Sequence, residues 1–360
     1  MWAQGLALRG RLPIFCESRF NAPMTGDRPV RHLIATLILA CLPMTAQALC
    51  EGRDLIDALA PGTRAEIAER AAATPYPEGL FWRATHEEAD GTRTEFLLFG
   101  TYHFRHARTD AHLEALRPVI GTADILYLEM DPSEQRDLQA RMSTDPSLLF
   151  LTEGPTMPDL LEEEEWQRFS AAMSERGFPT FMAAKFKPIW GSMMLSIGPC
   201  EAQNGAMEAT GIDQALGAYA EAEGIATRSL EEGGDLIALL DADPMEQQLA
   251  MLRLTLDLPL DADDLSYTIR ERYLAQEVAL IWEYSKHVAL EHGGPTAEAD
   301  FDRFEEMLLT TRNIAWVDRL MDEAMGRRVV IAAGAGHWPG ETGVLNLLEE
   351  RGFTLERLAF

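Results

Sequence analysis

The pattern of apolar residues predicts strands near both ends of the chain. "GLFWRATHE" and "TRTEFLLFG" flank "EADG", whose Asp-Gly pair is typical of a hairpin turn between two strands. "DILYLEMD" and "RRVVIAAG" carry apolar runs without polar alternation, which is typical of strands buried in a parallel sheet. "ATRSLE" is a further predicted strand.

Helical spacing of apolar residues dominates the rest of the chain. "DAHLEALRPVIG" predicts a helix between two of the strands, and residues 150–310 are mainly helical. "DLSYTIRERYLAQEVALIWEYSKHVAL" and "FDRFEEMLLTTRNIAWVDRLMDEAM" each predict a long amphipathic helix, and Pro188 predicts a kink or break. The fold predicted is α/β, with a mixed, largely parallel central sheet, flanking helices and a large helical insertion at about residues 150–310.

The N-terminus has the layout of an export signal. "RPVRHLIATLILACLPMTAQA" contains two arginines, a short apolar run and an Ala-x-Ala cleavage site at Ala48. Met24 is a natural start, so residues 1–23 read as an upstream extension. We therefore expect residues 1–48 to be the signal peptide with that extension. Residues 49–360 are then expected to form a single domain that is periplasmic or secreted.

Cleavage near Ala48 leaves two cysteines, Cys50 and Cys200. In an oxidising compartment these two could form one disulfide that ties the N-terminus to the middle of the chain. The alternative is a pair of free thiols.

Charge narrows the range of partners. The 360 residues carry a formal net charge of -27, which argues against nucleic acid and against an anionic membrane surface. The only membrane contact we expect is that of the signal peptide during export. An apolar content of 47% provides material for a sizeable core.

Candidate chemistry lies where the predicted strands end. An apolar strand is followed by G-x-x-H twice, in "EFLLFGTYH" and "VVIAAGAGH", which place His103 and His337; Glu129 ends "ILYLEM". Functional groups collect beyond the carboxyl ends of parallel strands. Two imidazoles and a carboxylate could bind a divalent metal with positions open for water, or act as acid and base without a metal. Each histidine taken alone also fits a structural role.

With both G-x-x-H segments in view, the chain resembles the TraB/GumN family, which includes the animal Tiki proteases. The resemblance covers roughly residue 75 to the end. Its marks are "LLFGTYH", "ADILYLEMD", "GIDQAL" with "SLEE", "TRNIAWVDRL" and "AAGAGHWPGETGVLNLLEERGFTLERL". Similarity to Tiki implies a metal-dependent hydrolase of peptide bonds, with the two motif histidines and a glutamate at the metal site.

Carried over by residue, His103 and His337 match the two motif histidines, and Glu129 matches the acidic residue that ends the strand after the first motif. Our hypothesis is that these three residues hold a divalent ion such as manganese, cobalt or zinc. The resemblance also places Asp213 of "GID", Glu231 of "SLEE" and Arg312 of "TRN" near the cleft. As a hypothesis, Asp213 or Glu231 orients a ligand or acts as general base, and Arg312 stabilises a developing oxyanion. Asp213 also fits an ordinary helix cap, and Arg312 an ordinary surface position.

Three functions remain open at this stage. The first is hydrolysis of a peptide, or a related amide or ester bond, at a metal site. The second is capture of a peptide or envelope glycan in the same cleft without catalysis. The third is a metal-free esterase that uses His103 or His337 as its base. Neither G-x-S-x-G nor H-E-x-x-H occurs in the chain, so those hydrolase chemistries lack support.

Overall fold

The computed structural model describes residues 50–104, 106–205 and 211–359, all of which belong to one compact unit. The predicted signal peptide and upstream extension, residues 1–48, lie outside the described residues. Within these ranges no helix combines the length and apolar character that a membrane span requires.

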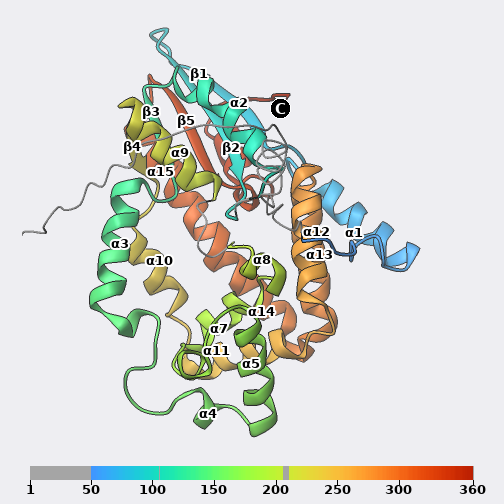
Figure 1. The fold of residues 1–360 in the computed structure, drawn as a ribbon. Helices are drawn as coiled ribbons and strands as arrows, with labels where there is room; N and C mark the ends of the chain where they lie inside the picture. The colour runs from blue at the N-terminus through green and yellow to red at the C-terminus, as the bar shows by residue number, and fades with distance from the viewer. Residues whose placement is uncertain (1–49, 105, 206–210, 360) are drawn as a thin grey trace, which may run out of the picture. The chain divides into compact units, whose positions relative to one another are not determined.

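A six-stranded sheet forms the centre of this unit (Figure 1). The strands are β1 (Phe81–Glu87), β2 (Arg93–Thr101), β3 (Ile125–Leu128), β4 (Ala226–Ser229), β5 (Arg328–Gly334) and β6 (Thr354–Arg357). Their order is β4-β3-β5-β2-β1-β6. Strands β4, β3, β5 and β2 are parallel to one another, whereas β1 is antiparallel to both of its neighbours, β2 and β6. The predicted α/β fold with a mixed, largely parallel sheet is confirmed.

The predicted hairpin is formed by β1 and β2, with Phe81 opposite Phe99. Its turn depends on two residues of "EADG". Asp90 accepts a hydrogen bond from the Thr92 N–H at 2.8 Å, and Gly91 adopts a φ of 87°, which favours glycine.

The central strand β5 is buried on both faces, as its unbroken apolar run predicts. Val329 and Ile331 pack with α15 (Thr311–Glu323) and α16 (Val344–Glu350) on one face. Val330 packs with α2 (Asp110–Ile120) and α9 (Ile212–Glu223) on the other. The two small residues that follow, Ala332 and Ala333, are also buried. The sheet is therefore covered on both sides, which a largely parallel sheet requires.

Helices connect and cover the strands. In the first half they are α1 (Pro61–Ala73), α2 (Asp110–Ile120), α3 (Pro132–Thr144), η1 (Pro146–Leu148), α4 (Met157–Leu160), α5 (Glu163–Glu175), α6 (Thr180–Ala183), α7 (Pro188–Leu195) and α8 (Pro199–Gln203). In the second half they are α9 (Ile212–Glu223), α10 (Gly233–Leu240), α11 (Met245–Asp257), α12 (Ala262–Leu274), α13 (Val278–His292), η2 (Gly294–Thr296), α14 (Ala297–Glu305), η3 (Glu306–Thr310), α15 (Thr311–Glu323), η4 (Ala335–His337) and α16 (Val344–Glu350).

The range 150–310 contains more than helices. Strand β4 and helix α9 fall inside it and belong to the sheet and its covering layer. Helices α4, α5, α6, α7 and α11 instead surround a core of their own, which includes Phe169 and Leu252 (Figure 1).

One predicted helix is wrong in its length. The apolar stretch expected to form a single long helix is divided into α12 and α13. Gln276 adopts a φ of 64° between them, and its carbonyl accepts a hydrogen bond from the Gly79 N–H at 3.0 Å. This contact with the segment before β1 turns the chain where local periodicity would continue the helix. Pro188 is the first residue of α7, so it marks a break between helices.

The cysteine pairing predicted from the sequence is present as a disulfide. Cys50 and Cys200 are bonded, with Cα atoms 5.7 Å apart. Beside the bond, the buried Arg270 donates to the Cys50 carbonyl at 2.6 Å and pairs with Glu201. The N-terminal segment is thereby fixed to α8 and α12.

Candidate functional site

Four neighbouring parallel strands each deliver one polar side chain to the same edge of the sheet. Following the order β4, β3, β5 and β2, these residues are Glu231, Glu129, His337 and His103. The ladder between β3 and β4 continues beyond the strands, since the Glu231 N–H donates to the Glu129 carbonyl at 3.1 Å. The carboxyl edge of the sheet therefore carries a row of ionisable groups, as expected for this topology.

His103 follows the end of β2 and faces the first turn of α9. Its Nδ1 lies 3.1 Å from Asp213 Oδ2, and the other carboxylate oxygen of Asp213 accepts from the Thr101 hydroxyl at 2.5 Å. The Nε2 atom lies 3.9 Å from Glu129 Oε1. The side chain is 57% exposed, so His103 forms the open side of the cluster.

His337 lies in η4, directly after β5, and its side chain is only 6% exposed. Its Nδ1 is 2.6 Å from Asn313 Oδ1, and its ring packs against Trp316 with centroids 4.2 Å apart. Its Nε2 lies 4.0 Å from the same Glu129 oxygen that His103 approaches. An amide oxygen at Nδ1 requires a proton on that nitrogen, which leaves Nε2 unprotonated in the neutral ring.

Arg312, in the first turn of α15, connects the carboxylates of the cluster. It donates to Glu231 through Nε at 2.8 Å and Nη2 at 2.6 Å, and Nη2 also reaches Glu129 Oε2 at 2.8 Å. Its Nη1 lies 3.3 Å from His337 Nε2 and donates to the Leu308 carbonyl at 2.8 Å. The guanidinium is thus fixed between two carboxylates and one imidazole.

Glycine at the end of β5 lets these groups approach one another. A Cβ atom on Gly334 would lie 2.7 Å from His103 Nε2 and 3.1 Å from Glu129 Oε1. The Gly334 N–H also donates to Glu129 Oε1 at 2.6 Å, which orients that carboxylate. A side chain at this position would fill the space between His103 and Glu129.

The two histidines differ in their affinity for a proton. Desolvation disfavours the charged form of His103, but the hydrogen bond and charge of Asp213, with the charge of Glu129, raise the pKa of His103 above its ordinary value. Burial, reinforced by the charge of Arg312, lowers the pKa of His337 to about 3 against the opposing charge of Glu129. His337 is therefore neutral at pH 7.

The carboxylates also differ. Burial opposes ionisation of Glu129, yet the imidazoles, Arg312 and the Gly334 N–H outweigh it and lower the pKa of Glu129. Burial raises the pKa of Glu231, although the hydrogen bonds from Arg312 act in the opposite direction. With His103 protonated and His337 neutral, the three carboxylates of Asp213, Glu129 and Glu231 and the cations of Arg312 and His103 leave a net charge of about -1, which becomes about -2 when His103 loses its proton.

All six residues singled out from the sequence lie in this one cluster. Asp213, interpreted either as a cap or as part of the site, contacts His103. Arg312 is 10% exposed and not a surface residue. Asn313 was not predicted from the sequence. It follows Arg312 directly in "TRN", and a polar residue beside a candidate site residue is the signal that could have identified it.

The donor set suits a divalent metal, but its spacing is wider than that of a formed site. Two ligands of one zinc ion lie roughly 3.4 Å apart when each bond is about 2.1 Å long. Here Glu129 Oε1 is 3.9 Å and 4.0 Å from the two Nε2 atoms. Among the described residues, no group of three or more His, Cys, Asp or Glu side chains is arranged so that it could hold a metal ion.

Comparison with protein families identifies the family of this chain. The family model described as the TraB/PrgY/gumN family matches residues 80–357, which is more than half of the chain and includes every residue of the cluster. No curated protein matches the chain.

Proposed function

Because this chain belongs to the TraB/PrgY/gumN family, we propose that it is an exported metal-dependent hydrolase. Its substrates would be peptide bonds, or related amide or ester bonds. The active site would be the cluster around His103, Glu129 and His337, with manganese, cobalt or zinc as the ion. Export is supported by the signal-like segment that ends near Ala48.

The observation that carries the proposal is the orientation of the two imidazoles. Each ring is held through Nδ1, His103 by Asp213 and His337 by Asn313, while each Nε2 is directed at the same oxygen of Glu129. Histidine ligands of metals characteristically donate one ring N–H to a carboxylate or another oxygen, which fixes the nitrogen that binds the ion. Loss of the His103 proton would leave the cluster with a net charge of about -2, which would favour a divalent cation.

Binding would require small rearrangements. The Nε2 atoms would need to approach the Glu129 oxygen by about half an ångström to reach normal ligand spacing. An ion would also replace the hydrogen bond from Arg312 Nη1 to His337 Nε2. Arg312 would retain its bonds to Glu231, which involve the Nε and Nη2 atoms.

The bound ion would supply a water molecule whose pKa is lowered to roughly 7. Glu231, which burial makes more basic than an exposed glutamate, is the group we assign to accept the proton of that water. Arg312 would stabilise negative charge on the carbonyl oxygen of the substrate. Attack of water on the carbonyl carbon would form the new C–O bond as the bond to the leaving nitrogen or oxygen breaks, and Glu231 would pass the proton it accepted to the leaving group.

Elemental analysis of protein purified without a histidine tag tests the metal site. We expect close to one equivalent of manganese, cobalt or zinc in the wild type after incubation with these ions. The double variant His103→Ala, His337→Ala should lose it. The matched control is His287→Ala, His292→Ala, which removes two histidines of α13 that lie outside the cluster and should leave the metal content unchanged.

Turnover is measured on the same preparations with a mixed peptide library and with p-nitrophenyl esters. Activity that follows the metal content supports the proposal. A wild type that binds none of the three ions contradicts the metal-dependent mechanism. A wild type that binds metal but cleaves neither class of substrate contradicts the hydrolase assignment and favours capture of a peptide or glycan.

A metal-free hydrolase is the second candidate, and the hydrogen bond between His103 and Asp213 favours it. A carboxylate that orients an accessible imidazole is the arrangement of a general base. Because the pKa of His103 is raised, this mechanism requires a rate that increases with pH as the imidazolium loses its proton. Activity that survives chelation and is lost in His103→Ala would identify it.

A further inference from the structure

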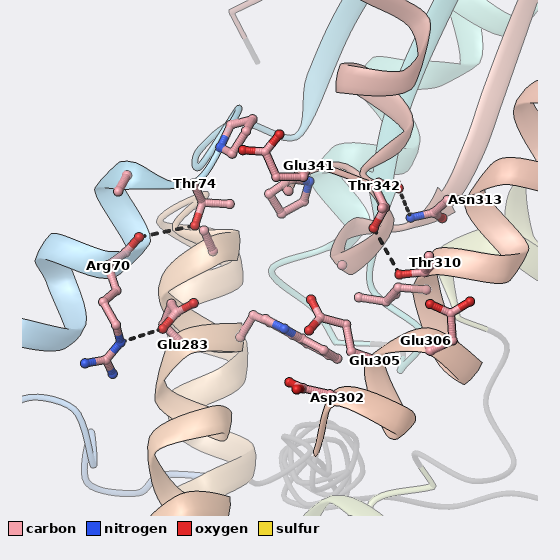
Figure 2. A pocket seen from close by; sticks show the side chains of 18 residues that line it. Arg70, Thr74, Glu283, Asp302, Glu305, Glu306, Thr310, Asn313, Glu341 and Thr342 are labelled. Carbon is pink, nitrogen blue, oxygen red and sulfur yellow. Dashed lines mark hydrogen bonds and ion pairs between the residues drawn. The ribbon is translucent and has the colours of Figure 1, made fainter. Parts of the chain in front are cut away.

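A cavity of about 490 Å³ lies beside the cluster but is separate from it. Its wall comes from α1, α13, α14, η3, α15 and the loop after η4 (Figure 2). None of His103, Glu129, Asp213, Glu231, Arg312 and His337 lines it. Two neighbours of His337 do, namely Gly336, which precedes it, and Asn313, which contacts its Nδ1 atom.

The polar lining of the cavity is strongly acidic. Its carboxylates are those of Glu283, Asp302, Glu305, Glu306 and Glu341, and its one basic side chain is Arg70. Five carboxylates and one guanidinium give a formal charge of about -4. Arg70 is already paired with Glu283 at 2.8 Å, and Lys286, which lies outside the lining, is paired with Asp302 at 3.4 Å; within the described residues Glu305, Glu306 and Glu341 form no ion pair. Figure 2 shows these carboxylates on different sides of the cavity.

The carboxylates are dispersed and accompanied by apolar surface. No three of them are grouped so that they could hold a metal ion, within the part of the chain that the structure describes. Between them lie apolar side chains, including Ala279, Trp282, Leu309 and Pro339. Trp282 is held in place by Phe301, with ring centroids 5.3 Å apart. This lining suits a cation that carries methylene groups better than it suits a bare ion.

Glu305 is a member of the set that a cation would stabilise in its charged form. Burial raises the pKa of Glu305, and the charges of Asp302 and Glu283 act in the same direction, while Lys286 and Trp282 oppose them. A positive group in the cavity would relieve this repulsion.

The cavity is connected to the catalytic cluster through Asn313. This residue is 1% exposed, donates to the Thr342 carbonyl at 2.9 Å and contacts the edge of the His337 ring remote from Glu129. The π-helical turn η3 also contacts both the cavity and the cluster. Its Leu309 and Thr310 line the cavity, while its Leu308 carbonyl accepts from Arg312. An occupant would therefore contact Asn313, which fixes His337, and the two residues that follow Leu308, whose carbonyl binds Arg312.

We propose that this cavity binds an aliphatic ammonium or guanidinium group on a methylene stem. Free polyamines and the basic side chains of peptides share this chemistry. Occupation does not depend on hydrolase activity, so the site can be tested whether or not the proposed function is correct.

Isothermal titration calorimetry at low ionic strength tests the site with 1,5-diaminopentane as the probe and 1,5-pentanediol as the neutral analogue of the same length. We expect the diamine to bind at least tenfold more tightly than the diol. The double variant Glu305→Gln, Glu341→Gln should weaken diamine binding at least tenfold. Its matched control is Glu246→Gln, Glu298→Gln, which removes the same charge from exposed glutamates of α11 and α14 outside the cavity.

Binding of the diamine no tighter than that of the diol would overturn the proposal. Equal weakening in the two double variants would also overturn it, because the diamine would then respond only to the overall negative charge. The source of the cation is resolved with Nα-acetyl-lysine methylamide. Binding as tight as that of the diamine identifies a peptide side chain, whereas binding of the diamine alone identifies a free polyamine.

Discussion

The two G-x-x-H segments have the same pattern in sequence and opposite surroundings in the structure. Both follow neighbouring parallel strands, β2 and β5, in which Thr101 lies opposite Gly334. His103 is 57% exposed and held by a carboxylate, whereas His337 is 6% exposed and held by an amide. One motif places its histidine where a substrate can reach it, and the other fixes its histidine within the core.

Replacing each histidine by alanine should give the largest contrast. Both variants should lose at least about 100-fold in metal affinity under the proposed function, because each removes one ligand. Only His337→Ala should also destabilise the fold, by about 2–3 kcal/mol, since it empties a buried site against Trp316. His103→Ala should remain within about 1 kcal/mol of the wild type.

Metal titration and urea unfolding of metal-free protein measure these two effects separately. If the two substitutions lower the free energy of unfolding equally, the difference in exposure between the two histidines has no effect on stability.

Two glycines of the second motif provide the next test. In Gly334→Ala the new Cβ would lie 2.7 Å from His103 Nε2, so we expect metal affinity to fall about 10–100-fold as the donors separate. In Gly336→Ala the new Cβ meets nothing within 4 Å, and the effect on stability should stay within about 0.5 kcal/mol. If both variants bind metal like the wild type, the close approach at Gly334 has no role in the site.

The opposite pKa shifts predict opposite pH dependence in metal-free protein. The pKa of His337 is lowered to about 3, so its contribution to stability is present above pH 6.5 and is lost as the pH falls from 6.5 toward 3. The pKa of His103 is raised, so its contribution is present below pH 6.5 and is lost as the pH rises through its folded-state value.

Urea midpoints measured with chelator between pH 4 and pH 10 in the wild type and in His103→Ala should reveal this difference. The substitution should remove part of the alkaline decline and leave the acidic decline in place. If the urea midpoint of His103→Ala falls at high pH as steeply as that of the wild type, the alkaline decline does not come from His103.

The smallest effect should come from exchanging the partners of the two imidazoles. Asp213→Asn should lower the pKa of His103, and Asn313→Asp should raise that of His337, because only a carboxylate stabilises the imidazolium by charge. Proton NMR of the ring Hε1 resonances in metal-free protein measures both values. Absence of a shift in either variant would mean that burial alone sets the difference.

The residues that end strands could be predicted from the sequence. His103, Glu129 and His337 each follow an apolar run, and the convergence of parallel strand ends brings them together whatever the helices do. Asp213 and Arg312 lie on helices, where the same residue types also serve as caps or surface groups. Only the resemblance to a family identified them.

Features that depend on tertiary contact could not be predicted. The position of Asn313 beside Arg312 could draw attention to it, but nothing in the sequence shows that its side chain faces His337. The break between α12 and α13 follows from the contact of Gln276 with Gly79, about 200 residues away. The spacing of apolar residues along the helix cannot reveal a contact of this kind. The acidic cavity likewise collects side chains from segments as distant as Arg70 and Glu341.

The disulfide has a consequence for how many ways the chain can cross-link. The full sequence contains four cysteines, which permit three complete pairings, whereas the segment after Ala48 contains two, which permit one. If residues 1–48 are removed on export, as we propose, every competing partner of Cys50 and Cys200 within the chain is eliminated. Oxidative folding of the processed chain would then need no isomerase to correct a wrong bond, only an oxidant to close the right one.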